Sequence, residues 1–126
     1  MATRILLIED DPFILRMYET KFHWEKLDVK VADNGLEGLK CLEEFDPDIV
    51  LLDLLMPELD GFEVLRKIRS DSKYDKLPVI VLSNINQDED IRRATELGAT
   101  DYFVKSELTP SQVVERIKEV VGRSIK

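Results

Sequence analysis

Acidic side chains follow two short apolar runs of this sequence. Glu9, Asp10 and Asp11 come directly after one run of four apolar residues, and Asp53 comes directly after another. Like charges that folding brings together repel, so such a cluster is usually neutralised by protons or by a cation. Carboxylate oxygens, with waters completing an octahedron, suit Mg²⁺. Because Asp11 is expected to cap the helix that follows, Glu9, Asp10 and Asp53 are the candidate metal ligands.

A hydroxyl group and an ammonium group follow two further apolar runs. Ser83 comes after residues 79–82, and Lys105 comes after residues 102–104. Ser83 can donate a hydrogen bond, and Lys105 supplies a positive charge on a flexible stem. One metal ion, one ammonium and one hydroxyl around a carboxylate would suit a dianionic phosphoryl group. A carboxylate can attack phosphorus to form an aspartyl phosphate, so Asp53 is the candidate nucleophile.

Each of these residues taken alone has a simpler interpretation. Asp10 could be a loop residue or a helix cap, Ser83 a turn residue and Lys105 a solvated charge. Their convergence favours the site, because four of the five predicted strands each end in one reactive residue type.

Five predicted strands alternate with predicted helices. Residues 5–8, 49–52 and 79–82 are continuously apolar, which is typical of strands covered on both faces. Residues 28–32 alternate between polar and apolar, which suits an edge strand, and residues 102–104 form a short fifth strand. Capping pairs mark four helix starts: Asn34 with Glu37, Asp60 with Glu63, Asn86 with Glu89, and Thr109 with Gln112.

Apolar stripes predict the buried faces of the first and last helices. The stripe of the first helix comprises Ile14, Met17, Tyr18 and Phe22. The stripe of the last helix comprises Val113, Val114, Ile117, Val120 and Val121. Pro12 and Pro110 stand at the first helical positions, where no backbone N–H is needed.

The order of these elements predicts an α/β fold with a doubly wound, five-stranded parallel sheet, (βα)5, of the flavodoxin-like type. Right-handed crossovers and an edge second strand favour the strand order 2-1-3-4-5. The winding then reverses between strands 1 and 3, so the acids that follow these strands meet in one crevice. With no linker or repeat, residues 1–126 are expected to form a single domain.

The composition argues against several classes of function. The 26 acidic and 18 basic residues give a net charge of −8, so direct binding of nucleic acid is not expected. No run approaches the ~18 apolar residues of a membrane span. Cys41 is the only cysteine and is expected to be buried, and a chain without an internal disulfide fits the cytoplasm. His23, the only histidine, cannot form a metal site alone.

In order and spacing, these segments resemble the receiver domain of two-component response regulators, the CheY-like family. The resemblance covers the whole chain and lies in residues 5–11, 48–57 followed by Asp60 and Gly61, 78–83, and 97–105. It implies that Glu9 and Asp10 hold Mg²⁺ together with Asp53 and the backbone carbonyl of Leu55. It further implies that Asp53 accepts a phosphoryl group from a histidine kinase or phosphotransfer protein.

The resemblance also implies a switch. Lys105 would contact the phosphoryl group, Ser83 would turn its hydroxyl toward it, and Tyr102 would rotate inward, unless it is a plain half-buried aromatic. The face made by the fourth helix, fifth strand and fifth helix would then repack and bind a downstream protein. The candidate residues of this face are Ile91, Ala94, Asp101 and Tyr102. The chain would act as a monomer or a weak dimer.

Three positions depart from the usual family pattern. Ser106 stands where proline often follows the lysine, in a bond that is commonly cis in the family. A non-proline cis bond costs ~2.5–4 kcal/mol, so the geometry beside Lys105 is expected to differ. Leu55 is apolar where polar residues are frequent. Asn84 is larger than the small residue often found after Ser83, and its size would crowd the phosphoryl pocket.

Three other functions are less well supported. A flavodoxin-like electron carrier would need N–H donors in the loop that here reads Glu9-Asp10-Asp11, which repels a flavin phosphate. An aspartate-nucleophile phosphatase would carry a D-x-D pattern at the nucleophile strand, but here Leu55 stands where the second aspartate would be. A receiver-like scaffold that takes no phosphate is disfavoured because every chemical residue is present. We therefore expect a phosphoacceptor switch rather than an enzyme.

Overall fold

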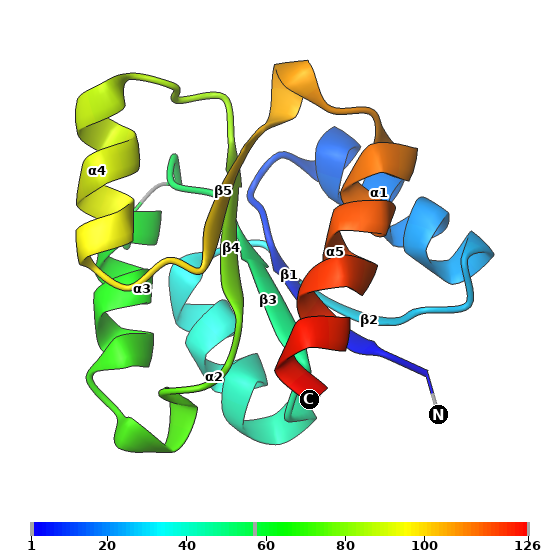
Figure 1. Cartoon of the computed structure of the whole chain (residues 1–126), viewed down its shortest axis with the longest axis horizontal. Helices are drawn as coiled ribbons and strands as arrows, with labels where there is room; N and C mark the ends of the chain where they lie inside the picture. The colour runs from blue at the N-terminus through cyan, green and yellow to red at the C-terminus, as the bar shows by residue number, and fades with distance from the viewer. Residues whose placement is uncertain (1, 57, 126) are drawn as a thin grey trace.

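In the described part of the chain, five parallel strands form one sheet in the order β2-β1-β3-β4-β5, as predicted (Figure 1). The computed structural model describes residues 2–56 and 58–125, with side chains as far as residue 122. The strands are β1 Arg4–Ile8, β2 Asp28–Ala32, β3 Ile49–Leu52, β4 Val79–Ser83 and β5 Asp101–Val104. The bounds of each predicted strand therefore differ from the observed bounds by at most one residue.

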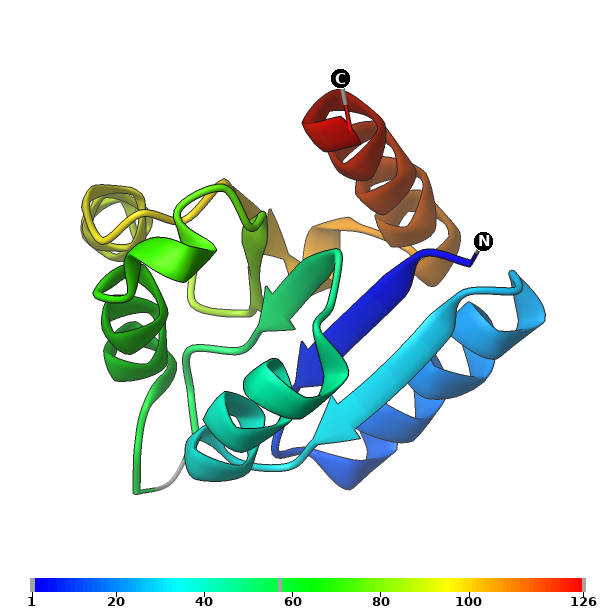
Figure 2. The same ribbon diagram turned by 90° about the horizontal axis from the view of Figure 1, so that it is seen from below.

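Helices cover both faces of the sheet (Figure 2). One face is covered by α1 Pro12–Trp24 and α5 Pro110–Ile125. The other is covered by α2 Gly35–Phe45, α3 Gly61–Arg69 and α4 Asp88–Glu96. Two short 3₁₀ turns, η1 Ser72–Tyr74 and η2 Lys105–Glu107, precede β4 and α5.

Alternating side chains of the central strands form two separate cores. In β1, Ile5 and Leu7 pack toward α1 and α5, whereas Leu6 and Ile8 pack toward α2, α3 and α4. All four are almost completely buried. A strand between two helical layers needs apolar residues on both faces, which explains why these runs do not alternate.

Most predicted helix starts are confirmed. Asp11 caps α1 by accepting from Phe13 N at 2.9 Å. Three capping residues accept hydrogen bonds from the backbone three positions on: Asn34 from Glu37 N, Asp60 from Glu63 N, and Thr109 from Gln112 N. The prediction for Asn86 is wrong, because α4 begins after Gln87, whose side chain makes no capping bond. Acids at positions 88–90 lie in the first turn instead, where the helix dipole favours negative charge.

The apolar stripe of α5 is confirmed, since its five residues are all buried. In α1, Tyr18 and Phe22 are fully buried and Ile14 packs against the same core. The prediction for Met17 is wrong, because its side chain is exposed. Met17 lies four residues after Phe13, one helical turn along the same outer face.

Gly61 permits the closest backbone approach beside the acidic edge. Its N–H donates to Leu54 O at 3.0 Å, and a Cβ at this position would lie 2.2 Å from Asp53 O and 2.5 Å from Leu54 Cα. Neither backbone atom can yield without displacing the end of β3. The start of α3 therefore depends on a residue with no side chain.

We predict that Gly61→Ala lowers the free energy of unfolding by about 2 kcal/mol, because it forces two backbones apart. Gly122→Ala is the matched control, since a Cβ there meets no atom within 4 Å. That control should gain up to about 1 kcal/mol from helix propensity. Urea unfolding measures both variants, and equal stability of Gly61→Ala and the parent would contradict the proposed clash.

Candidate functional site

Three carboxylates meet at the carboxyl edge of the sheet, where the winding reverses between β1 and β3. Glu9 follows β1 and is 1% exposed, and Asp53 follows β3 and is 5% exposed. Asp10 is half-buried, and one oxygen from each of the three side chains lies within 4.8 Å of the others. The predicted cluster of Glu9, Asp10 and Asp53 is therefore present in the structure.

Lys105, the first residue of η2, reaches this cluster from the carboxyl end of β5, which is an edge strand of the sheet. Its ammonium forms an ion pair with the carboxylate of Glu9, and its Nζ lies 3.4 Å from Asp53 Oδ2. Burial raises the pKa of Glu9 to about 7, against the lowering effect of the Lys105 hydrogen bond, and the nearby charge of Asp53 raises it further. When all three carboxylates are ionised, one ammonium leaves two negative charges without a counterion. The site can thus accept a cation.

Backbone N–H groups hold the carboxylates in place. Glu9 Oε2 accepts from Asp11 N at 3.1 Å, and Asp53 Oδ1 accepts from Leu55 N at 3.3 Å. Asp53 therefore presents Oδ2 to Lys105 while Oδ1 is fixed by its own loop. Asp11 serves as the cap of α1, as expected, and Leu55 is 61% exposed. Pro57, the last residue of the predicted phosphoacceptor segment, lies outside the described residues.

Ser83 and Tyr102 are joined through the loop that follows β4. Ser83 is fully buried, and its Oγ accepts from Ile85 N at 3.5 Å. The hydroxyl of Tyr102 donates to Ile85 O. Burial raises the pKa of Tyr102 to about 12, with smaller contributions from the charges of Asp90 and Asp53. One loop residue thus contacts both of the predicted switch residues.

Sequence reasoning missed a link between the loop that follows β4 and the turn that follows β5. Ser106 N donates to Asn84 Oδ1 at 3.0 Å. Both residues depart from the usual family pattern, but nothing in the sequence pairs them. No peptide bond among the described residues is cis, so the bond between Lys105 and Ser106 is trans.

The predicted switch face is only partly at the surface. Ile91, Asp101 and Tyr102 are half-buried. Ala94 is fully buried in the core beneath α4, so its prediction as a surface residue is wrong. Because a small residue lets α4 approach the sheet closely, Ala94 has a packing role.

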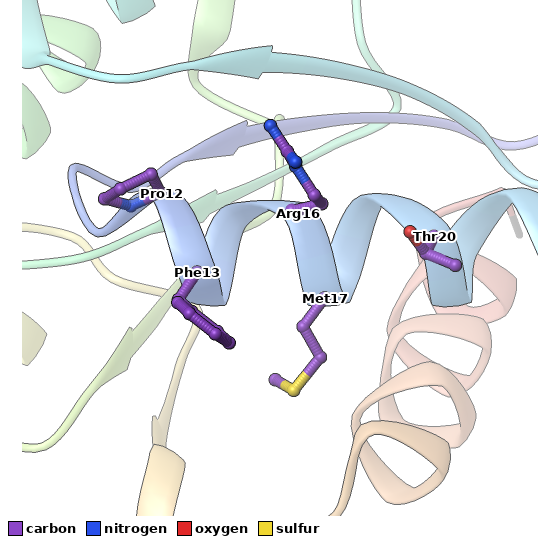
Figure 3. A pocket seen from close by; sticks show the side chains of 5 residues that line it. All are labelled: Pro12, Phe13, Arg16, Met17 and Thr20. Carbon is purple, nitrogen blue, oxygen red and sulfur yellow. The ribbon is translucent and has the colours of Figure 1, made fainter.

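A groove on α1 adjoins the carboxylate loop (Figure 3). It is lined by Pro12, Phe13, Arg16, Met17 and Thr20. Phe13 is 87% exposed, and its side chain points to the same side of the helix as that of Met17. This apolar surface begins directly after Asp11.

Comparison with known proteins establishes the family. The response regulator receiver domain family matches residues 5–118, and the chain belongs to this family. Its members are phosphoacceptor signalling domains of two-component systems, and the flavodoxin-like electron carrier is thereby set aside.

Relatives and solved structures agree with this assignment. The chain is 44% identical over 101 residues to the transcriptional regulatory protein AfsQ1 of Streptomyces coelicolor, covering 80% of this chain and 44% of that protein. It is 40% identical over 121 residues to the cell cycle response regulator CtrA of Brucella ovis, covering 96% and 51%. The chain spans about half the length of these curated relatives.

A crystal structure of a CheY-like receiver domain protein from Methanospirillum hungatei superposes with a TM-score of 0.90 at 26% identity, covering 98% of this chain and 97% of that one. Within the described residues, no helix combines the length and apolar character that crossing a membrane requires.

Removing the Lys105 charge tests the electrostatics of this site. We predict that Lys105→Met lowers the free energy of unfolding by about 2–3 kcal/mol at neutral pH, because two buried carboxylates lose their counterion. Lys118→Met is the matched control: Lys118 pairs with Glu25 at 3.6 Å, its side chain is 56% exposed, and its loss should cost no more than about 0.5 kcal/mol. Urea unfolding without divalent cations measures both, and equal effects would contradict the buried ion pairs.

Proposed function

We propose that this receiver domain accepts a phosphoryl group on Asp53 from a histidine kinase or phosphotransfer protein, with Mg²⁺ held beside it. One observation carries the proposal. The buried Asp53 carboxylate lies among two further carboxylates and 3.4 Å from the Lys105 ammonium. A nucleophile, a candidate metal site and a cation for the incoming group are thus assembled at one point.

The donor set fits Mg²⁺. Glu9, Asp10 and Asp53 offer hard oxygen ligands, and their excess negative charge favours a divalent cation. These three side chains would hold the ion together with the backbone carbonyl of Leu55. When bound, Mg²⁺ supplies charge neutralisation for the phosphoryl oxygens.

Individual residues of the chain have separate roles in the proposed phosphoryl transfer. A carboxylate oxygen of Asp53 attacks phosphorus, and the bond from phosphorus to the donor's leaving atom breaks, with the electron pair departing on the donor. Asp53 is oriented for this by Leu55 N–H on Oδ1. Lys105 balances the negative charge that arrives, because its ammonium already lies beside Oδ2. The product is one aspartyl phosphate per chain, as expected of a switch.

The signal would pass through the loop after β4. Ser83 would turn its hydroxyl from Ile85 N toward the phosphoryl group, and this turn would release Ile85. Tyr102 hydrogen-bonds to the same residue, so it would respond next. The face formed by α4, β5 and α5 would change in consequence and bind a downstream protein.

Replacing the nucleophile tests the acceptor. Asp53→Asn keeps the shape of the side chain but replaces the nucleophilic carboxylate by a neutral amide, so acetyl phosphate should label the parent with one phosphate and leave the variant unlabelled. Asp60→Asn is the control, because asparagine caps a helix as well as aspartate does. Intact-mass spectrometry measures the label. A phosphate on Asp53→Asn would show that another residue is the acceptor.

Adding and removing Mg²⁺ tests the metal. Millimolar Mg²⁺ should raise the melting temperature, since it binds the folded state and relieves carboxylate repulsion. The same addition should have little effect on Asp10→Asn, and chelation should stop labelling of the parent. Differential scanning fluorimetry and mass spectrometry provide the two measurements. An unchanged melting temperature with labelling that survives chelation would refute the metal site.

A further inference from the structure

Two loops at the carboxyl edge are connected by one hydrogen bond from backbone to side chain. Ser106 N donates to Asn84 Oδ1 at 3.0 Å, although the two residues lie 22 positions apart. Asn84 directly follows the buried Ser83, and Ser106 directly follows Lys105. The bond therefore joins the immediate neighbours of two site residues.

The bond supplies a hydrogen-bond acceptor that the turn containing Lys105 lacks. The first N–H groups of a helical turn have no acceptor within that turn. In η2 the capping position is held by Val104, whose aliphatic side chain makes no capping hydrogen bond. Because Val104 pairs with Ser83 across the sheet, Asn84, the first residue after β4, is close enough to supply the missing acceptor.

The identity of residue 106 decides whether this bond can exist. A proline there has no backbone N–H, and it also disfavours helical geometry at the residue before it. Ser106 supplies the N–H and leaves Lys105 free to adopt the 3₁₀ conformation that it has in this structure. The departures at positions 84 and 106 are thus two halves of one interaction.

Lys105 consequently lies between two residues that are linked to the end of β4 and to the residue that follows it. On one side Val104 pairs with Ser83, and on the other Ser106 is bonded to Asn84. Between these links the Lys105 side chain reaches Glu9 and Asp53. Loss of either link would let the turn, and with it the ammonium, shift relative to the carboxylates.

We propose that Asn84 is a positioning residue for phosphoryl transfer: by capping the turn at Ser106 it holds the Lys105 ammonium in place beside Asp53. This inference rests on the proposed function, because the role of Lys105 toward the phosphoryl group belongs to it. Asn84 itself contacts none of the reacting atoms and acts through Lys105.

The proposal opposes the expectation from size. If Asn84 crowded the phosphoryl pocket, Asn84→Ala would speed labelling. If Asn84 positions Lys105, the same variant should lower the maximal rate of labelling by acetyl phosphate about two- to tenfold, the effect of one hydrogen bond. The Mg²⁺ concentration for half-maximal labelling should fall, because an ammonium that moves away from Glu9 and Asp53 competes less with the metal ion for their carboxylates. Rates equal to or faster than the parent's would overturn the proposal.

Asn34→Ala is the matched control. Asn34 Oδ1 accepts from Glu37 N at 2.8 Å, so its loss removes the same kind of bond at the start of α2. It should lower the melting temperature without changing the labelling rate. A parallel loss of labelling rate in Asn34→Ala would mean that the effect of Asn84→Ala is only one of stability, and would overturn the proposal.

A double-mutant cycle with Ser106→Pro tests the pair itself. With the donor removed, Asn84→Ala should cause no further loss of rate, and the separate effect of proline on Lys105 cancels because it is present in both arms. If the rate loss of the double variant equals the product of the two single-variant losses, the proposal is overturned. If the proline variant does not fold, amide hydrogen exchange decides: the Ser106 amide should be protected in the parent and lose protection in Asn84→Ala, and unchanged protection would overturn the pairing. A parent that takes no label at all would refute the proposed function, and this inference with it.

Discussion

Burial of like charges at one edge of the sheet is the constraint on which the rest of the structure depends. Parallel pairing of β1 and β3 brings Glu9 and Asp53 together, and both are almost completely buried. The repulsion between them is tolerated because Lys105 arrives from β5 and because burial raises the pKa of Glu9 to about 7. A single ammonium cannot balance three ionised carboxylates. With all three carboxylates ionised, the edge therefore carries excess negative charge, which a bound cation would balance.

The surrounding scaffold keeps these groups from moving apart. Apolar residues on both faces of the central strands fix where each strand ends, and so where its polar residue begins. Gly61 lets the start of α3 contact the end of β3 directly, which restrains the Asp53 loop at its far end. Local backbone donors then set each carboxylate: Asp11 N on Glu9 and Leu55 N on Asp53. Positioning at this edge comes from backbone geometry more than from side-chain packing.

Sequence reasoning predicted the fold and the main site residues because both depend on simple periodic rules. Unbroken apolar runs identify buried parallel strands, and the residue after each run must lie at the carboxyl edge. Those rules place Glu9, Asp53 and Lys105 together without knowledge of any distance. They cannot place Asn84 against Ser106, because that bond depends on how two irregular loops approach each other in space.

Helix faces were harder to predict for a related reason. Met17 and Ala94 are apolar residues on two different helices. In each helix, a small rotation about the helix axis decides whether the residue is buried or exposed. Tertiary packing sets that rotation: α1 buries Tyr18 and Phe22 and leaves Met17 outside, whereas α4 turns Ala94 inward. The start of α4 was also misjudged, because three consecutive acids stabilise its first turn without a side-chain cap.

The direction of the strands has a consequence for anything attached to this chain. β1 begins and α5 ends at the edge of the sheet opposite the carboxylates (Figure 1). A label or fused domain joined at either end is thus separated from the acidic edge by the length of a strand, roughly 16 Å for five residues. The point of attachment therefore lies away from the proposed site of phosphorylation. A change at Asp53 would reach that point through the packing of the helices against the sheet.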